Sequence, residues 1–176
     1  MTHYILINGP PKSGRSTLAR LLQKRLIGSH QAELHAPLKH FFCAAMALKW
    51  SVLAIDKPRG ILNGRSTIDS LRQLRNHLCG LYGPDVLGKW LHFRVLGMVP
   101  IPAIVIVDDV LSPDDVGVLS SDNRVTLIRI VRGGENNFTP VPSPHYVVIN
   151  ANDIRYLGHR ADQITGTLNK AIVEAR

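Results

Sequence analysis

The segment that follows the first apolar run of the chain has the spacing of a phosphate-binding loop. It begins at residue 9 and reads Gly-Pro-Pro-Lys-Ser-Gly-Arg-Ser-Thr. In the pattern G-x-x-x-x-G-K-[ST], both glycines and Ser16 stand at the expected places, and Arg15 replaces the lysine. Glycines let successive backbone N–H groups turn inward, and a following helix directs the positive end of its dipole at the same place. The segment is therefore predicted to hold the phosphates of a nucleotide such as ATP.

The side chains of this loop would complete the site. Arg15 is placed to reach the outer phosphates, with Lys12 as a second positive charge, and the hydroxyl of Ser16 or Thr17 to ligate the accompanying Mg²⁺. An arginine fork holds two phosphate oxygens at once, whereas a lysine ammonium follows a phosphoryl group as it moves, so we expect binding to survive the substitution better than turnover. The competing interpretation is a plain turn with solvated basic residues. The predicted nucleotide-binding residues are Gly9, Ser13, Gly14, Arg15, Ser16 and Thr17.

Two acids end the most apolar segment of the chain. Residues 102–107 are rich in β-branched side chains, which predicts a strand buried on both faces of a parallel sheet, and Asp108 and Asp109 follow it. One carboxylate would hold Mg²⁺ across from the loop hydroxyls, and the other would contact a substrate hydroxyl or base. We assign Asp108 to the metal and the substrate, and Asp109 to catalysis. The alternative is a strand that simply ends in solvated acids.

Basic residues elsewhere fit the transfer of a phosphoryl group, which needs positive charge around the transferred group and exclusion of water. Arg129 and Arg132 flank the start of a loop at 132–145 that is rich in Gly, Asn and Pro, and we assign them to stabilising that group beneath a lid. The alternative is a pair of solvated arginines at a strand edge. Four further basic residues are predicted to bind the acceptor, although each alone would also fit a surface charge. They are Lys39, Arg65, Arg72 and Arg75.

These residues need a scaffold in which strands alternate with helices. Such alternation predicts a three-layer α/β fold with a mostly parallel sheet, in which ligands bind beyond the carboxyl ends of the strands. The phosphate loop and the two acids both fall there. Ser66 with Asp69, and Ser112 with Asp115, have the form of helix caps, which is a sufficient structural explanation for those acids. Strands are predicted at 4–7, 32–36, 102–107, 125–131 and 146–149, and the longer helices at 16–26, 38–53, 66–78, 84–97 and 160–174.

The composition sets the class of protein. A chain of 176 residues with 45% apolar and 19% charged residues predicts one globular domain without a membrane helix or a secretion signal, so we expect it in the cytoplasm. Cys43 and Cys79 lie in apolar segments and are interpreted as reduced core thiols. The histidines show no metal-ligand spacing with them, so none is assigned to a metal. The net charge of +8 fits an anionic partner, either a nucleotide or, less favoured because the charges are scattered, nucleic acid.

The order of these motifs resembles the phage-type deoxynucleoside monophosphate kinases of the P-loop kinase superfamily. The resemblance is low in identity but runs along nearly the whole chain. It implies a P-loop kinase fold in one domain over 1–176, with a five-stranded sheet, a helical acceptor-binding region at about 37–98, a lid-like loop at about 132–145, and ATP and Mg²⁺ as cofactors. The similar stretches are residues 9–17, His35-Ala36-Pro37-Leu38-Lys39, Arg72 to Asp85, Asp109 to Asp115, Arg129-Ile130-Val131-Arg132 and Val148-Ile149-Asn150.

The departures from the family pattern bear on activity. Arg15 stands for the loop lysine, Ala36 for an expected acid and Leu111 for an expected arginine. The leading hypothesis is a kinase that moves the γ-phosphoryl group of ATP to a deoxynucleoside monophosphate, with a homodimer left open. The alternatives are a nucleotide- or DNA-binding protein with weak or lost transfer activity, and a P-loop kinase for another small hydroxyl compound.

Overall fold

The computed structural model describes residues 1–10, 12–54, 62–109, 112–132, 143–150 and 153–173. Five strands form one sheet in the order β2-β3-β1-β4-β5, and every pairing in it is parallel. The predicted α/β class with a parallel five-stranded sheet is therefore confirmed. Most of the predicted lid loop lies outside the described residues. The strands are β1 (His3–Asn8), β2 (Ser29–Ala32), β3 (Ile104–Val107), β4 (Arg124–Arg132) and β5 (Tyr146–Asn150).

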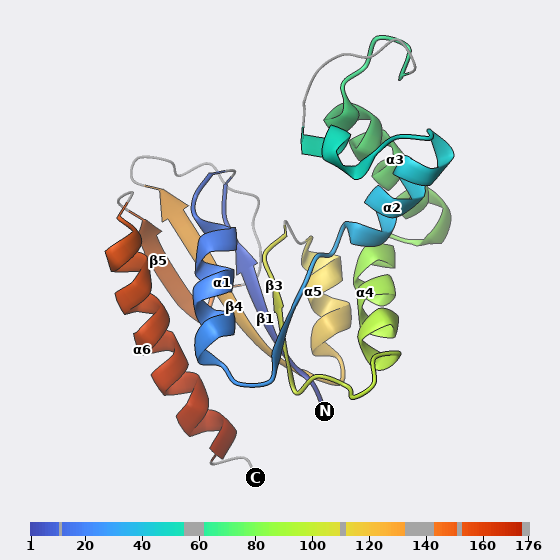
Figure 1. The fold of residues 1–176 in the computed structure, drawn as a ribbon. Helices are drawn as coiled ribbons and strands as arrows, with labels where there is room; N and C mark the ends of the chain where they lie inside the picture. Colours follow the sequence, from blue (N-terminus) through green and yellow to red (C-terminus); the bar gives the residue numbers. More distant parts are fainter. Residues whose placement is uncertain (11, 55–61, 110–111, 133–142, 151–152, 174–176) are drawn as a thin grey trace.

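Helices cover both faces of the sheet. On one face α1 and α6 pack on the isoleucines of β1, β3 and β4, and on the other face α4 and α5 pack on the alternate residues of the same strands (Figure 1). This division follows from the two-residue period of a strand, because each strand contributes side chains to both layers. The helices are α1 (Arg15–Arg25), α2 (Ala36–Ala45), α3 (Thr67–Tyr82), α4 (Val86–Leu96), α5 (Pro113–Ser120) and α6 (Ile154–Val173), with a 3₁₀ helix at Trp50–Ala54.

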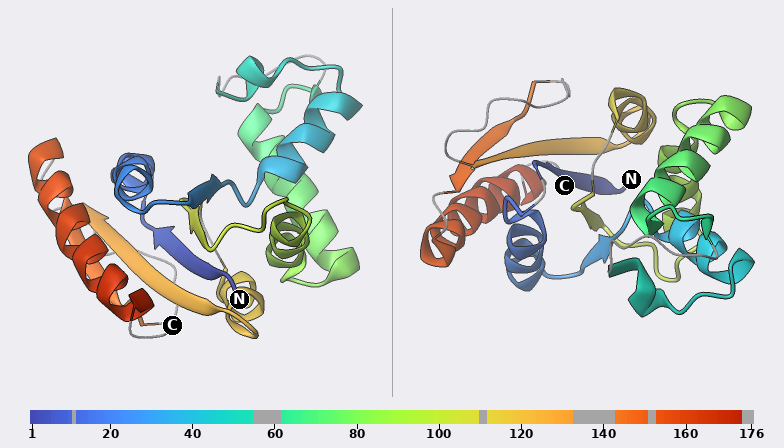
Figure 2. Two further views of the ribbon diagram at one scale, coloured as in Figure 1. Left: turned by 60° about the horizontal axis from the view of Figure 1, so that its bottom comes forward. Right: turned by 90° about the horizontal axis from the view of Figure 1, so that it is seen from above.

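The helices between β2 and β3 are divided between two places. Helix α4 packs against α5 on the sheet, whereas α2, the 3₁₀ helix and α3 lie beyond the carboxyl ends of the strands (Figures 1 and 2). The loop between β1 and α1 opens at this same end of the sheet (Figure 1). The topology thus brings the predicted phosphate loop and the predicted acceptor region to one end of the molecule.

Four predicted elements had wrong boundaries, one of them the helix predicted at 66–78, which continues to Tyr82. The second strand occupies Ser29–Ala32 rather than 32–36, because its register with β3 begins at Ser29 opposite Ile104. The predicted helix at 38–53 ends at Ala45, since Ala47 adopts a φ of 49°, and only a short 3₁₀ helix follows. The last helix starts at Ile154, earlier than expected. Within the described residues, no helix has the length and apolarity needed to cross a bilayer.

Candidate active site

The loop between β1 and α1 runs too close to two neighbouring strands for side chains at its glycines. A Cβ atom on Gly9 would lie 2.8 Å from the carbonyl oxygen of Ile130 in β4. A Cβ atom on Gly14 would lie 2.8 Å from Nδ2 of Asn150 in β5, and Gly14 has a φ of 99°, which glycine adopts most readily. The two framing glycines of the motif are therefore required by close approach as well as by the turn.

Two asparagines that end strands hold this loop in place. The side-chain oxygen of Asn8 accepts the Gly9 N–H at 2.8 Å, at the end of the buried strand β1. The side-chain nitrogen of Asn150 donates to the carbonyl oxygen of Ser13 at 2.6 Å. Both asparagines are buried. The loop is thus fixed from its own strand and from β5, a strand far away in the sequence.

Three buried donors around the loop have no hydrogen-bond partner within the described part of the chain. They are Nδ2 of Asn8, Oγ of Ser13 and Nη1 of Arg15. Leaving a buried polar group unpaired costs about 1–3 kcal/mol, so such groups call for an explanation. They surround the start of α1, which has no acidic residue in its first turn and no side-chain cap at Gly14. A bound phosphate would satisfy these donors and the helix N-terminus together, so the residues present fit the phosphates of a nucleotide.

A polar cavity of about 640 Å³ lies beside the loop. Its lining includes Ser16 and the two acids after β3. The hydroxyl of Ser16 and the carboxylate of Asp108, both predicted to hold Mg²⁺, therefore border the same cavity. Thr17 is half-buried and Lys12 is exposed, and neither lines this cavity. Among the described residues, no group of three or more His, Cys, Asp or Glu side chains could hold a metal alone. The lining residues are Arg15, Ser16, Arg20, Gln23, Gln31, Ala32, Glu33, Lys39, Asp108 and Asp109.

Asp109 is fixed by the residue that begins α2. Its Oδ2 accepts the backbone N–H of His35 at 3.0 Å and lies 3.4 Å from the ring nitrogen Nδ1 of the same residue. Burial raises the pKa of the Asp109 carboxyl, but the hydrogen bonds from His35 and the positive charges of His35 and Lys39 outweigh it and hold the pKa below its ordinary value. Asp109 is thus an anion at neutral pH. Lys39 itself forms an ion pair with Glu33.

A second cavity, of about 710 Å³, lies between α2 and α3 and has mainly apolar walls. Lys39 lines both this cavity and the polar one, so the two adjoin. Arg72 and Arg75, two of the four predicted acceptor residues, line the second cavity, whereas Arg65 bonds to Gln73 and lines a separate cavity. The lining residues of the second cavity are His35, Leu38, Lys39, Leu53, Ile68, Leu71, Arg72, Arg75, Asn76, Ser112 and Pro113.

The two arginines of β4 lie at the edge of the sheet where the loop opens. Arg129 is level with Asn8 in the pairing of β4 with β1, and Arg132 is level with Asn150 in the pairing with β5. Both side chains are half-buried. The sheet register therefore brings both arginines to the two strand ends that hold the loop.

Sequence reasoning missed four polar residues of this region. Asn8 and Asn150 each end a strand, and a search for polar residues at the carboxyl ends of buried strands would have found both. His35 begins α2 and had no role assigned to it. Asp115 was interpreted only as a cap, and its capping box with Ser112 is confirmed. Its burial and its ion pair with Arg75 have no local sequence signal, because both depend on how α3, α4 and α5 pack.

Comparisons with known proteins give a fold but no family. No family model matches the chain, and no curated protein matches it in sequence. Among solved structures, a cysteine-to-alanine mutant of the Mycobacterium tuberculosis APS kinase CysC is similar, with 13% identity, a TM-score of 0.53, and coverage of 96% of this chain and 97% of that one. A sugar kinase from a Janibacter species reaches a TM-score of 0.43 at 15% identity over 92% of each chain. The first of these similarities, together with the strand order and the loop after β1, shows that the chain has the fold of the P-loop kinases.

Proposed function

We propose that the protein is an ATP-dependent phosphotransferase that moves the γ-phosphoryl group to a small acceptor, and that a deoxynucleoside monophosphate is the first acceptor to test. The observation that carries this proposal is the pair of adjoining cavities. One is polar and borders the phosphate loop, the other is apolar with arginines in its wall, and Lys39 lines both. This arrangement suits a donor phosphate and an anionic acceptor that meet where the cavities join.

Each group of residues has a role in this proposal. The loop backbone and the unpaired donors of Asn8 and Ser13 bind the donor phosphates, and Arg15 neutralises their charge from inside the cavity. Ser16 and Asp108 would hold Mg²⁺, which would draw negative charge from the phosphates.

Four further residues surround the transfer in the proposal. Arg129 and Arg132 stabilise the transferred group from the end of β4, with Lys12 as a further positive charge, and Asp109 orients the acceptor. As the acceptor oxygen forms its bond to phosphorus, the bond to the bridging oxygen breaks and ADP leaves.

A coupled assay of ADP release over the four deoxynucleoside monophosphates tests this proposal. Turnover with at least one of them is expected, and Asp108→Asn should reduce it strongly because the metal then loses a charged ligand. Asp114→Asn is the matched control, since Asp114 is an exposed acid in the first turn of α5. Measurable ATP binding without turnover of any acceptor would refute the kinase and favour a nucleotide-binding protein.

A hydroxyl compound is the second candidate acceptor, and the contact of His35 with Asp109 favours it. His35 lines the apolar cavity between α2 and α3, which we call the acceptor cavity. Its Nδ1 faces Asp109, and its Nε2 makes no hydrogen bond within the described part of the chain. An imidazole oriented by a carboxylate can remove the proton of a hydroxyl nucleophile, a step that a phosphate acceptor does not need. Turnover of nucleosides or small sugars, lost in His35→Gln, would support this candidate. Turnover of monophosphates alone, unchanged in His35→Gln, would exclude it.

A further inference from the structure

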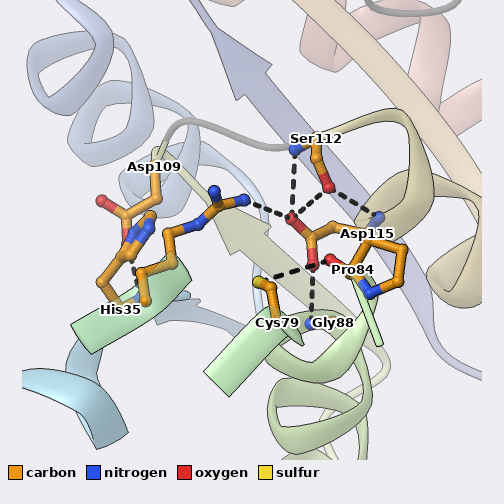
Figure 3. Close-up of polar contacts among 8 residues, drawn as sticks. His35, Cys79, Pro84, Gly88, Asp109, Ser112 and Asp115 are labelled. Atoms are coloured by element: carbon orange, nitrogen blue, oxygen red, sulfur yellow. Dashed lines mark hydrogen bonds and ion pairs between the residues drawn. The ribbon is translucent and has the colours of Figure 1, made fainter. Parts of the chain in front are cut away.

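The carboxylate of Asp115 is completely buried and contacts three helices. Its Oδ1 accepts the backbone N–H of Gly88 in α4 at 2.9 Å, and its Oδ2 accepts both the backbone N–H and the hydroxyl of Ser112 at 3.1 and 2.7 Å (Figure 3). The same Oδ2 lies 3.8 Å from Nη2 of Arg75 in α3. A Cβ atom on Gly88 would lie 3.0 Å from the Cα atom of Asp115, so α4 seals this carboxylate from solvent.

Capping alone does not explain this burial. The start of α3 has a similar arrangement, in which Ser66 accepts the backbone N–H of Asp69 and donates to its carboxylate. There the side chain of Asp69 is 53% exposed, whereas that of Asp115 has no exposure. Burying a carboxylate costs several kcal/mol unless hydrogen bonds and an opposite charge compensate it. Since a solvated acid caps a helix equally well, the burial of Asp115 requires an explanation beyond capping.

Arg75 differs from the other predicted acceptor arginines in its freedom to bind a ligand. Arg72 forms an ion pair with Asp69 at 2.8 Å and its side chain is 66% exposed, and Arg65 lines another cavity. The side chain of Arg75 is 29% exposed and lines the acceptor cavity. Within the described part of the chain its only polar contact is the ion pair with Asp115, which engages one nitrogen. The other N–H groups of its planar fork therefore stay available for an anion.

We infer that Asp115 is a positioning residue that holds the guanidinium of Arg75 at the wall of the acceptor cavity, where Arg75 binds the phosphate group of the acceptor. The inference rests on the proposed function, and it names the dianionic phosphate monoester as the part of the acceptor that is recognised. Because the carboxylate is fixed by Gly88 and Ser112, the arginine is oriented before the ligand arrives. A guanidinium oriented in advance loses less side-chain entropy on binding.

Removing the charge of Asp115 has two opposing effects on anion binding. The loss of a nearby negative charge strengthens the positive potential in the cavity, whereas the loss of the ion pair lets the guanidinium turn away from the ligand. The inference requires the second effect to win, because the ion pair is the only polar contact that orients Arg75 among the described residues. Asp115→Asn should therefore weaken phosphate binding, although it makes the cavity more positive.

The test follows the side-chain N–H signal of Arg75 by ¹⁵N NMR while inorganic phosphate is added in the presence of saturating ADP, which occupies the phosphate loop. Calorimetry under the same conditions measures phosphate binding in the variants. In the wild type this signal should be ordered before phosphate is present and should shift on titration. Arg75→Gln and Asp115→Asn should each weaken phosphate binding at least tenfold, and Asp115→Asn should add no further loss to Arg75→Gln. Asp114→Asn is the matched control, because it removes the charge of the exposed neighbouring acid in the first turn of α5, and it should leave phosphate binding nearly unchanged.

Three results would overturn the inference. They are a mobile Arg75 signal in the phosphate-free wild type, phosphate binding that Arg75→Gln leaves intact, and binding that is unchanged or tighter in a folded Asp115→Asn protein. The first two need no variant of Asp115, so they apply even if Asp115→Asn fails to fold. Phosphate binding through Arg75 without turnover of any monophosphate would refute the deoxynucleoside monophosphate as the acceptor and leave the positioning role standing.

Discussion

Gly14→Ala should disrupt nucleotide binding and lower stability, for reasons that the loop geometry makes quantitative. Gly14 has a φ of 99°, and an L-residue with a Cβ atom in the left-handed region costs about 1–2 kcal/mol. The new Cβ would also lie 2.8 Å from Nδ2 of Asn150 and 3.1 Å from Cδ1 of Leu157. If Asn150 moves away it gives up its bond to the carbonyl of Ser13, and a lost buried hydrogen bond costs about 1–3 kcal/mol.

The two costs add to about 2–5 kcal/mol for Gly14→Ala. In a chain of this size, 1 kcal/mol shifts the melting temperature by about 2–4 °C, so a loss of about 4–20 °C is expected. Gly28→Ala is a matched control, since Gly28 has a φ of 75° but no atom within 4 Å of its added Cβ. It should lose only the backbone cost of about 1–2 kcal/mol.

The assay measures thermal unfolding of both variants with and without ATP. ATP should stabilise the wild type and Gly28→Ala by similar amounts, because Gly28 lies far from the loop in sequence and is exposed. It should stabilise Gly14→Ala much less, since the displaced loop no longer presents its N–H groups to the phosphates. Equal losses of stability in the two variants, or an undiminished ATP effect in Gly14→Ala, would refute this account of the loop.

Three further predictions concern activity, pH and the core. Arg15→Lys should raise turnover several-fold with little change in ATP affinity, measured by steady-state kinetics and calorimetry; a parallel change in both would contradict the reasoning. Burial and the charge of Arg124 lower the pKa of His3, so stability should fall as the pH drops below about 6.5 toward the folded value, and His3→Gln should flatten that part of a urea-unfolding profile. Leu22→Ala should lower the free energy of unfolding by about 2–5 kcal/mol, measured with urea, because Leu22 is fully buried. Leu21→Ala should lower it clearly less, because Leu21 is half-buried.

The sequence predicted the sheet because its strands carry strong local signals. The run ending at Val107 is uninterrupted and β-branched, and it forms a strand that is buried on both faces. The cap signals at Ser66 and Ser112 are also local. The box at Ser112 forms in full, whereas Ser66 accepts the N–H of Asp69 without the reciprocal bond to its own backbone N–H among the described residues. The end of α2 could not be read in the same way, since apolar residues continue past Ala45 while the backbone turns at Ala47. The periodicity of apolar side chains does not reveal the backbone φ angle at which a helix ends.

The candidate site was predictable only in part, for a related reason. Motif spacing identifies which residues border the phosphate loop, but it does not say which basic side chain is already paired. Arg72 and Arg75 lie one helical turn apart and carry the same charge, yet Arg72 is paired with an exposed acid of its own helix and Arg75 with a buried acid of α5. That difference arises because the tertiary packing of the helices brings Arg75 of α3 to Asp115 of α5, which no short window of sequence encodes.

The substitution in the phosphate loop concerns transfer more than binding. The glycines, the two asparagines and the helix N-terminus form the cradle without any basic side chain, so they do not depend on the missing lysine. Arg15 lines the polar cavity and has a buried nitrogen without a partner in the described chain, so its charge lies where an anion would sit. A rigid fork matched to the ground-state phosphates gains little when the phosphoryl group moves, and interactions that do not strengthen in the transition state do not raise kcat. We therefore predict that the proposed transfer depends on the arginines of β4 more than it would with a lysine at position 15.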